Sequence, residues 1–226
     1  AYYCTNAYSG TKFNSFKEER ESELVGSLAP LEESTIDLLL NDVNRFALKS
    51  QVEFQTNLEP TSPCNSFLTS LFQKERLFFM LRYGLVYVEE RDDKGQIQLQ
   101  KHAMRYPQYF ATKAIESELQ KGMKKGVIWH TQGSGKTALA FFNIRYLKDF
   151  YAKQDLVPQF YFVVDRLDLA DQAFKEFTKR GLHVKRINNP RELNQVQDLY
   201  DVSVVNIHKF KESSDLTDHS GYDLNR

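Results

Sequence analysis

A glycine-rich loop lies between an apolar stretch and a helix-like segment in the second half of this chain. The sequence from Gly126 to Thr137 reads GVIWHTQGSGKT. Gly133 and Gly135 allow backbone N–H groups to converge on phosphate oxygens, and a helix that begins directly after them adds its positive N-terminal end. Lys136 can reach the β and γ phosphates of a nucleotide, and the Thr137 hydroxyl can ligate Mg²⁺. The pattern therefore predicts a phosphate-binding loop between a strand and a helix.

One position departs from the general form of such loops, which has a glycine five residues before Gly135. This chain has His130 there. The alternative interpretation is a glycine-rich loop that only caps a helix. A nucleotide site is favoured because an apolar run, 126–129, precedes the loop and an apolar helical segment, 136–151, follows it. The predicted nucleotide-binding residues are Thr131, Gln132, Gly133, Ser134, Gly135, Lys136 and Thr137; Lys136 and Thr137 are also the predicted catalytic residues, and Thr137 the predicted metal ligand.

Composition and charge set wide bounds on the rest. With 226 residues and 41% hydrophobic content, the chain can bury a real core. No apolar run approaches the roughly 18 residues that cross a bilayer, and the N-terminus does not resemble a signal peptide, so we expect a cytoplasmic protein without a membrane partner. Cys4 and Cys64 lack metal-ligand spacing and are expected to be free thiols. The net charge is zero, but 101–125 is basic, which suits either nucleic-acid phosphates or, more commonly, a solvated helix face.

The pattern of secondary structure changes near residue 100. Before it, we expect helices at 35–48 and 66–81 and a hairpin of strands at 85–88 and 97–100. After it, strands and helices alternate. The expected helices are 105–123, 136–151, 167–179 and 192–199, and the expected strands are 126–129, 159–165, 183–187 and 202–206. Continuous apolar strands separated by helices predict an α/β fold with a parallel sheet covered on both faces and a ligand beyond the strand carboxyl ends.

The motifs near the loop indicate which nucleotide is bound. No Asn-Lys pair occurs in the chain, which excludes the guanine-specific Asn-Lys-x-Asp motif. Gln108, in the segment Tyr106-Pro107-Gln108, lies at the start of the helix expected at 105–123, ahead of the strand expected at 126–129. One amide can both donate to and accept from the edge of adenine, so Gln108 is a candidate adenine-binding residue. Alone, it would be read as an ordinary polar residue at a helix start.

Taken together, these motifs resemble the R subunit of type I restriction enzymes, the ATP-driven DNA-translocating subunit whose motor belongs to helicase superfamily 2. The similar segments are 104–108, 129–137 (including His130 in place of glycine), 163–172 and 204–210. The resemblance extends over about 66–226 and is strongest at 105–172. It implies a partial, RecA-like P-loop NTPase domain with a parallel sheet flanked by helices at 101–226, the first motor domain, preceded by a mixed helical and β lead-in region at 1–100.

The resemblance also implies ligands and partners. ATP and Mg²⁺ would be the cofactors, and double-stranded DNA and the methyltransferase and specificity subunits would be the partners. Asp165, Arg166 and Gln172 would face DNA, although Asp165 could equally cap the helix that follows it. The intact subunit would be a site-specific deoxyribonuclease driven by ATP.

Two motifs of this enzyme class are missing from the sequence. Hydrolysis needs a strand that ends in Asp-Glu, and no Asp-Glu pair occurs in the chain. A nuclease centre would need a lysine with Glu or Gln two residues before it, and no lysine has one. We therefore expect a middle piece of a larger subunit that binds ATP with Mg²⁺ weakly, hydrolyses it negligibly and does not cut DNA. Two alternatives stay open: another superfamily 2 DNA or RNA helicase, and a non-catalytic docking module with a vestigial loop.

Overall fold

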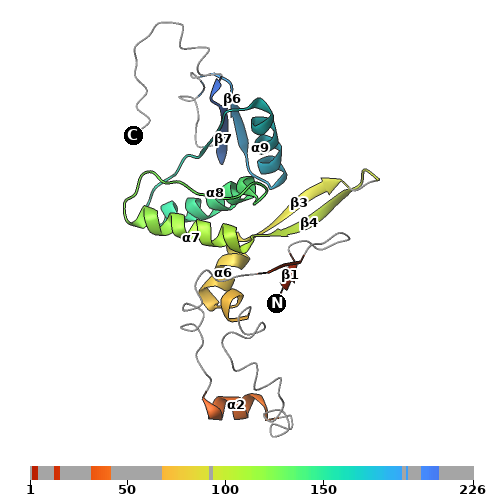
Figure 1. Cartoon of the computed structure of the whole chain (residues 1–226), viewed down its shortest axis with the longest axis vertical. Helices are drawn as coiled ribbons and strands as arrows, with labels where there is room; N and C mark the ends of the chain where they lie inside the picture. Colours follow the sequence, from red (N-terminus) through yellow and green to blue (C-terminus); the bar gives the residue numbers. More distant parts are fainter. Residues whose placement is uncertain are drawn as a thin grey trace. The chain divides into compact units, whose positions relative to one another are not determined.

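The chain divides into two compact units, which are described separately. The computed structural model describes residues 2–4, 13–15, 32–41, 68–91, 94–189, 192 and 200–208. The first unit comprises Ala1–Tyr87 and Gln100–Trp129, and the second comprises Val88–Leu99 and His130–Arg226. Figure 1 labels most of the helices and strands along the chain. The expected boundary between a lead-in region and a nucleotide domain at residue 100 stays a prediction.

Aromatic side chains of two helices, α6 (Lys74–Tyr83) and α7 (Tyr106–Gln120), pack together in the first unit. Among its described residues, the other labelled helix is α2 (Glu33–Leu39), and a short antiparallel pair joins β1 (Tyr2–Cys4) to β2 (Phe13–Ser15). Phe79 of α6 lies with its ring centroid 5.3 Å from that of Tyr109 of α7, edge to face. Arg76 lies over the Tyr109 ring at 5.0 Å and donates to the Ser70 carbonyl and hydroxyl at 2.7 and 2.8 Å. Aromatic packing and a buried guanidinium thus join α6 to α7.

Two expected elements before residue 100 differ from the structure. The single helix expected at 66–81 is wrong: residues 68–71 are helical, Phe72 and Gln73 are not, and α6 begins at Lys74. The break lies at Gln73, whose ψ of 132° is extended rather than helical. Helix α2 covers part of the helix expected at 35–48, and 42–48 lie outside the described residues.

The expected hairpin is confirmed, with longer strands. Strands β3 (Leu85–Arg91) and β4 (Ile97–Ala103) form a two-stranded sheet. The backbone N–H of Met104 then donates to the Gly84 carbonyl at 2.7 Å, which extends the pairing past the strand ends. Alternation is clear in β3, where Val86 and Val88 are buried and Tyr87 is exposed, as expected of a strand with one covered face.

A parallel three-stranded sheet and two helices make up the described core of the second unit. The strands β5 (Tyr161–Val164), β6 (Val184–Ile187) and β7 (Val202–Asn206) pair in the order β5-β7-β6. The helices are α8 (Lys136–Ala152) and α9 (Leu167–Lys179). These elements confirm the α/β class, the parallel sheet and the predicted positions of both helices and all three strands to within two residues. Of the helix expected at 192–199, only residue 192 is described.

Helix α9 covers one face of this sheet (Figure 1). Its buried residues Ala170, Ala173 and Phe177 recur at helical spacing, and the Phe177 ring lies edge to face on Phe162 of β5 at 5.2 Å. All five residues of β7 are buried. On β5, however, Tyr161 and Val163 point away from that face and are 41% and 54% exposed. The expectation that both faces are covered therefore holds for the central strand and fails for β5.

The strand expected at 126–129 is wrong. Residues 123–131 have no regular secondary structure, and Val127 and Trp129 are 89% and 91% exposed. A strand is stable only where a neighbour pairs with its backbone, and no strand of the described sheets pairs with this run. Apolar composition alone therefore did not identify a strand. In the described ranges, no helix is both long enough and apolar enough to cross a bilayer.

Candidate functional site

The glycine-rich loop ends directly in the first turn of α8. Gly133 and Gly135 have φ values of 76° and 83°, in the left-handed region that glycine adopts without steric cost. Gly135 is the residue before the helix and offers no side chain to cap it. The first N–H groups of a helix have no intrahelical partner, so the loop delivers backbone donors and the positive end of the α8 dipole to one place. This is the predicted backbone geometry for an anion site.

The loop is open to a ligand. A Cβ atom at Gly133 would meet no atom within 4 Å, and Thr131, Gln132, Gly133 and Lys136 are all exposed. Ser134 and Gly135 are half-buried. No packed side chain fills the space above Gly133, so the residues that are present fit a phosphate group.

The Lys136 side chain folds over the loop. Its Nζ donates to the carbonyl oxygens of His130 at 3.3 Å and Thr131 at 3.0 Å. Within the described part of the chain, Lys136 forms no ion pair with a carboxylate, so its charge is not neutralised there. A phosphate oxygen could replace the two carbonyls, because an ammonium group binds an anionic acceptor more strongly than a neutral one.

Thr137 and His130 lie on either side of this lysine in the sequence. Thr137 is half-buried in the first turn of α8. Across 94–189 and the other described ranges, no three His, Cys, Asp or Glu side chains gather in a metal-binding cluster. Metal binding by Thr137 stays a prediction. His130 is half-buried, and its Nδ1 lies 3.4 Å from the Ser134 Oγ.

Gln108 has a structural role in the first unit. It is 3% exposed, and its Oε1 accepts the Arg105 backbone N–H at 2.9 Å, which caps the start of α7. Its carbonyl accepts the Thr112 hydroxyl at 2.9 Å. The loop from His130 onward belongs to the other compact unit. Adenine binding by Gln108 therefore stays a prediction.

The three residues expected to face DNA follow β5 or lie on α9. Asp165 and Gln172 are exposed. Arg166 is the residue before α9, and its Nε and Nη2 donate to the Asp168 carboxylate at 3.0 and 2.5 Å. This hydrogen bond is the main cause that holds the pKa of Asp168 below its ordinary value. Helix α9 has no side-chain cap, so the alternative capping role of Asp165 is not seen. Contact with DNA stays a prediction.

Sequence reasoning missed two polar features of the second unit. At the carboxyl end of the central strand β7, Asn206 is 4% exposed; its Oδ1 accepts the His208 backbone N–H at 3.0 Å, and its Nδ2 has no partner among the described residues. At the opposite end of the sheet, Asp201 binds Lys148 of α8 and accepts the His183 backbone N–H at 2.8 Å. No sequence pattern marks the contacts of Asp201, whose partners lie 18 and 53 residues away in the chain.

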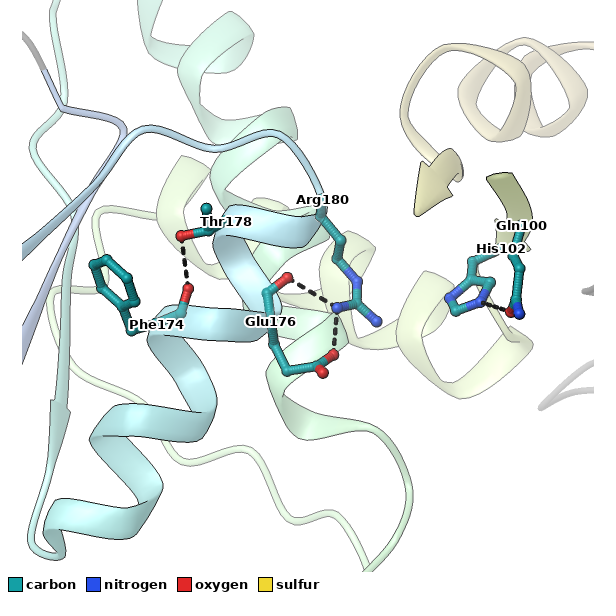
Figure 2. A network of polar contacts seen from close by, with 6 residues as sticks. All are labelled: Gln100, His102, Phe174, Glu176, Thr178 and Arg180. Carbon is teal, nitrogen blue, oxygen red and sulfur yellow. Dashed lines mark hydrogen bonds and ion pairs between the residues drawn. The ribbon is translucent and has the colours of Figure 1, made fainter. Parts of the chain in front are cut away.

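Figure 2 shows local polar contacts within each unit separately. At the end of α9, Arg180 donates to the Glu176 carbonyl at 2.9 Å and pairs with the Glu176 carboxylate, and Thr178 donates to the Phe174 carbonyl at 2.8 Å. On β4, the His102 Nε2 and the Gln100 Oε1 lie 3.4 Å apart. These contacts are local hydrogen bonds at the end of α9 and on β4, and we assign no binding role to them.

Comparison with known proteins gives several relatives of one kind. The chain is 36% identical over 131 residues to a protein named as the endonuclease subunit of the type I restriction enzyme MjaVIIP in Methanocaldococcus jannaschii, over 56% of this chain and 12% of that protein. It is 35% identical over 119 residues to the HindI endonuclease subunit of Haemophilus influenzae, over 50% of this chain and 11% of that protein. A Staphylococcus aureus endonuclease subunit is 35% identical over 98 residues, over 42% of this chain and 10% of that protein.

These matches confirm the resemblance to R subunits of type I restriction enzymes, of which the chain spans about a tenth of the length. A profile of the family described as SWI2/SNF2 ATPase matches residues 107–224. That match includes the glycine-rich loop, α8, α9 and all three strands of the parallel sheet, and it extends over more than half of the 226 residues. The chain therefore belongs to the SWI2/SNF2 ATPase family.

Proposed function

We propose that this chain is the ATP-binding part of the DNA-translocating R subunit of a type I restriction enzyme, and that residues 101–226 are part of a RecA-like P-loop NTPase domain. The single observation that carries the proposal is the loop in which Gly133 and Gly135 both have positive φ and lead directly into α8 at an exposed Lys136. The family match supports an ATPase, and the names of the relatives support a restriction subunit.

Different residues would bind different parts of the nucleotide. Lys136 would exchange its two carbonyl partners for oxygens of the β and γ phosphates, and the Thr137 hydroxyl would ligate Mg²⁺. The backbone donors would come from the loop, and Gln108 would bind adenine. The loop residues concerned are Thr131, Gln132, Gly133, Ser134 and Gly135. Bound ATP with Mg²⁺ would supply the phosphoanhydride bond whose hydrolysis drives movement.

DNA is the proposed substrate of the intact subunit. Asp165, Arg166 and Gln172 would face double-stranded DNA from the carboxyl end of β5 and from α9. The methyltransferase and specificity subunits would be the protein partners. The complex would act in the cytoplasm, where its DNA substrate is found. The endonuclease named in the relatives would cleave DNA after translocation.

The first test is binding of a fluorescent ATP analogue in the presence of Mg²⁺ to the 226-residue chain and to Lys136→Ala. We expect the substitution to weaken binding at least about tenfold, because a charge-assisted contact with phosphate is worth roughly 1.5–3 kcal/mol. The matched control is Lys153→Ala, which removes an exposed lysine from the far end of α8 and should leave affinity unchanged.

Two outcomes would overturn the proposal. Absence of binding by the wild-type chain would indicate a docking module with a vestigial loop. Equal binding by the wild type and Lys136→Ala, with both folded by circular dichroism, would show that the analogue binds elsewhere.

A further inference from the structure

We infer that His130 is a positioning residue of the phosphate loop, which holds the loop in its ligand-binding shape through the Ser134 hydroxyl before nucleotide arrives. The inference rests on the proposed function, because the loop is taken as the nucleotide site. It concerns the position at which this chain departs from the general glycine of such loops. A glycine there has no side chain, so the histidine adds a contact that the general pattern cannot make.

Four contacts connect the start of the loop to its end. The His130 Nδ1 and the Ser134 Oγ lie 3.4 Å apart. The Ser134 backbone N–H donates to the Thr131 carbonyl at 3.3 Å. The His130 and Thr131 carbonyls both accept from Lys136 Nζ, at 3.3 and 3.0 Å. The side chain of His130 therefore lies across the same turn whose carbonyls hold the lysine.

A loop of this composition needs such a contact. Gly133 and Gly135 give access to positive φ, but glycine also loses more conformational freedom than any other residue when the chain is ordered. Ordering the loop only when nucleotide binds would reduce affinity by that cost. A side chain that fixes the separation of His130 and Ser134 in the free chain reduces the cost, because the loop is ordered in advance.

Lys136 adds a second consequence. Its ammonium group is held by the two carbonyls at 130 and 131. The His130–Ser134 contact keeps these carbonyls in place. We therefore expect loss of the contact to affect the position of the lysine as well as the glycines, and so to affect nucleotide affinity rather than the stability of α8.

The test is a double-mutant cycle on the 226-residue chain: His130→Ala, Ser134→Ala and both together, with Ser134→Ala preserving the backbone N–H of the loop. The readout is the dissociation constant of a fluorescent ATP analogue. One hydrogen bond corresponds to about a 2- to 10-fold change. We expect each single variant to weaken binding by a factor in that range, and the double variant to be no weaker than the weaker single variant.

His130→Asn is the conservative variant. Asparagine carries its polar atoms on Cγ, as histidine carries Nδ1, so it can still reach the Ser134 hydroxyl. We expect it to recover most of the affinity lost in His130→Ala. The matched control is His183→Ala, which removes an exposed histidine directly before β6 and should bind the analogue like the wild type.

A second readout needs no nucleotide. Trp129 is the only tryptophan of the chain, it is exposed, and it directly precedes His130. Its fluorescence anisotropy reports loop motion on the nanosecond timescale. We expect His130→Ala and Ser134→Ala to lower this anisotropy, and His130→Asn and His183→Ala to leave it unchanged. Circular dichroism should show the same helix content and thermal midpoint in all variants.

The outcomes separate this inference from the proposed function. If the wild type binds the analogue in a Lys136-dependent way, but the single variants bind equally well or their effects multiply in the double variant, the inference about His130 is wrong and the nucleotide site stands. If neither the wild type nor any variant binds the analogue, the proposed function fails. Unchanged Trp129 anisotropy in His130→Ala and Ser134→Ala would reject the positioning role.

Discussion

Gly133 and Gly126 differ in backbone conformation, and this difference decides whether a substitution by alanine is strained. A Cβ atom at either position would meet nothing within 4 Å, so neither site is crowded. Gly133, however, has a φ of 76°, and Gly126 does not have a positive φ. An L-residue in the left-handed region costs of order 1–3 kcal/mol, whatever the space around it. The difference between the two glycines is therefore one of backbone strain.

This difference gives a prediction for the loop. Gly133→Ala should weaken binding of the fluorescent ATP analogue by about fivefold or more, because about 1 kcal/mol of strain opposes the ligand-binding conformation. Gly126→Ala should leave binding unchanged. Titration of both variants under the same conditions gives the comparison. Equal affinities for Gly133→Ala and the wild type would show that the loop binds in a different backbone conformation.

At single residues, the sequence predicted the backbone of the loop better than its side-chain contacts. The types and order of Gly133, Gly135 and Lys136 predicted a turn into a helix, and the positive φ values and the start of α8 confirm it. The pairing of His130 with Ser134 could not be predicted, because it depends on how the loop folds. The same holds for Gln108, whose burial and capping contact come from the packing of α7.

Among the elements, periodicity succeeded where an element buries a regular face. The bounds of α9 follow from apolar residues at helical spacing, and those of β7 from a continuous apolar run in the centre of a sheet. Periodicity failed at Gln73, where the apolar pattern continues through a helix break. It failed again at 126–129, because composition does not say whether a strand finds a neighbour. Local patterns indicate whether a segment tends to form a helix or a strand. Whether a strand finds a partner depends on the rest of the fold.

Asp201 joins three elements at the amino end of the parallel sheet. Its carboxylate pairs with Lys148 of α8 and accepts the His183 N–H just before β6, and its own N–H, just before β7, donates to the His183 carbonyl at 2.8 Å. Burial raises the pKa of Asp201, but the hydrogen bonds from Lys148 and His183 and the charge of Lys148 outweigh it. The pKa therefore lies below the ordinary value of 3.8.

The sign of the pH dependence follows from this shift. A carboxyl group with a lowered folded-state pKa stabilises the fold above its unfolded-state pKa, near 3.8, and loses that contribution as the pH falls through the folded-state value. We expect Asp201→Ala to lower the free energy of unfolding by about 1–2 kcal/mol at pH 7, and by less near pH 3. Urea denaturation at both pH values measures the difference.

Asp201→Asn is the matched variant. Its amide oxygen can still accept the His183 N–H, but it carries no charge for Lys148. The free energy of unfolding of Asp201→Asn at pH 7 should therefore lie between the values of the wild type and Asp201→Ala. If Asp201→Ala lowers the free energy of unfolding by the same amount at pH 7 and near pH 3, the ionised carboxylate does not stabilise the fold.

For the whole molecule, what matters is which parts of a motor the 226 residues contain. They contain a loop suited to phosphate, a parallel sheet and the family match at 107–224. They contain no Asp-Glu pair, and the relatives are about ten times longer than the matched segment. Binding of a nucleotide needs only the loop and the helix that follows it. Hydrolysis also needs a carboxylate to orient water and a cation to stabilise the transferring phosphoryl group.

The chain should therefore bind nucleotide without turning it over. In a phosphate-release assay with ATP and Mg²⁺, we expect the 226-residue chain to show no turnover above background, with or without duplex DNA. A longer subunit that contains this chain should hydrolyse ATP when duplex DNA is added, and Lys136→Ala in that subunit should abolish the stimulation because the γ phosphate loses its cation. Stimulation by RNA instead of duplex DNA would favour an RNA helicase. Robust, DNA-stimulated turnover by the 226 residues alone would show that they already hold the groups that activate water.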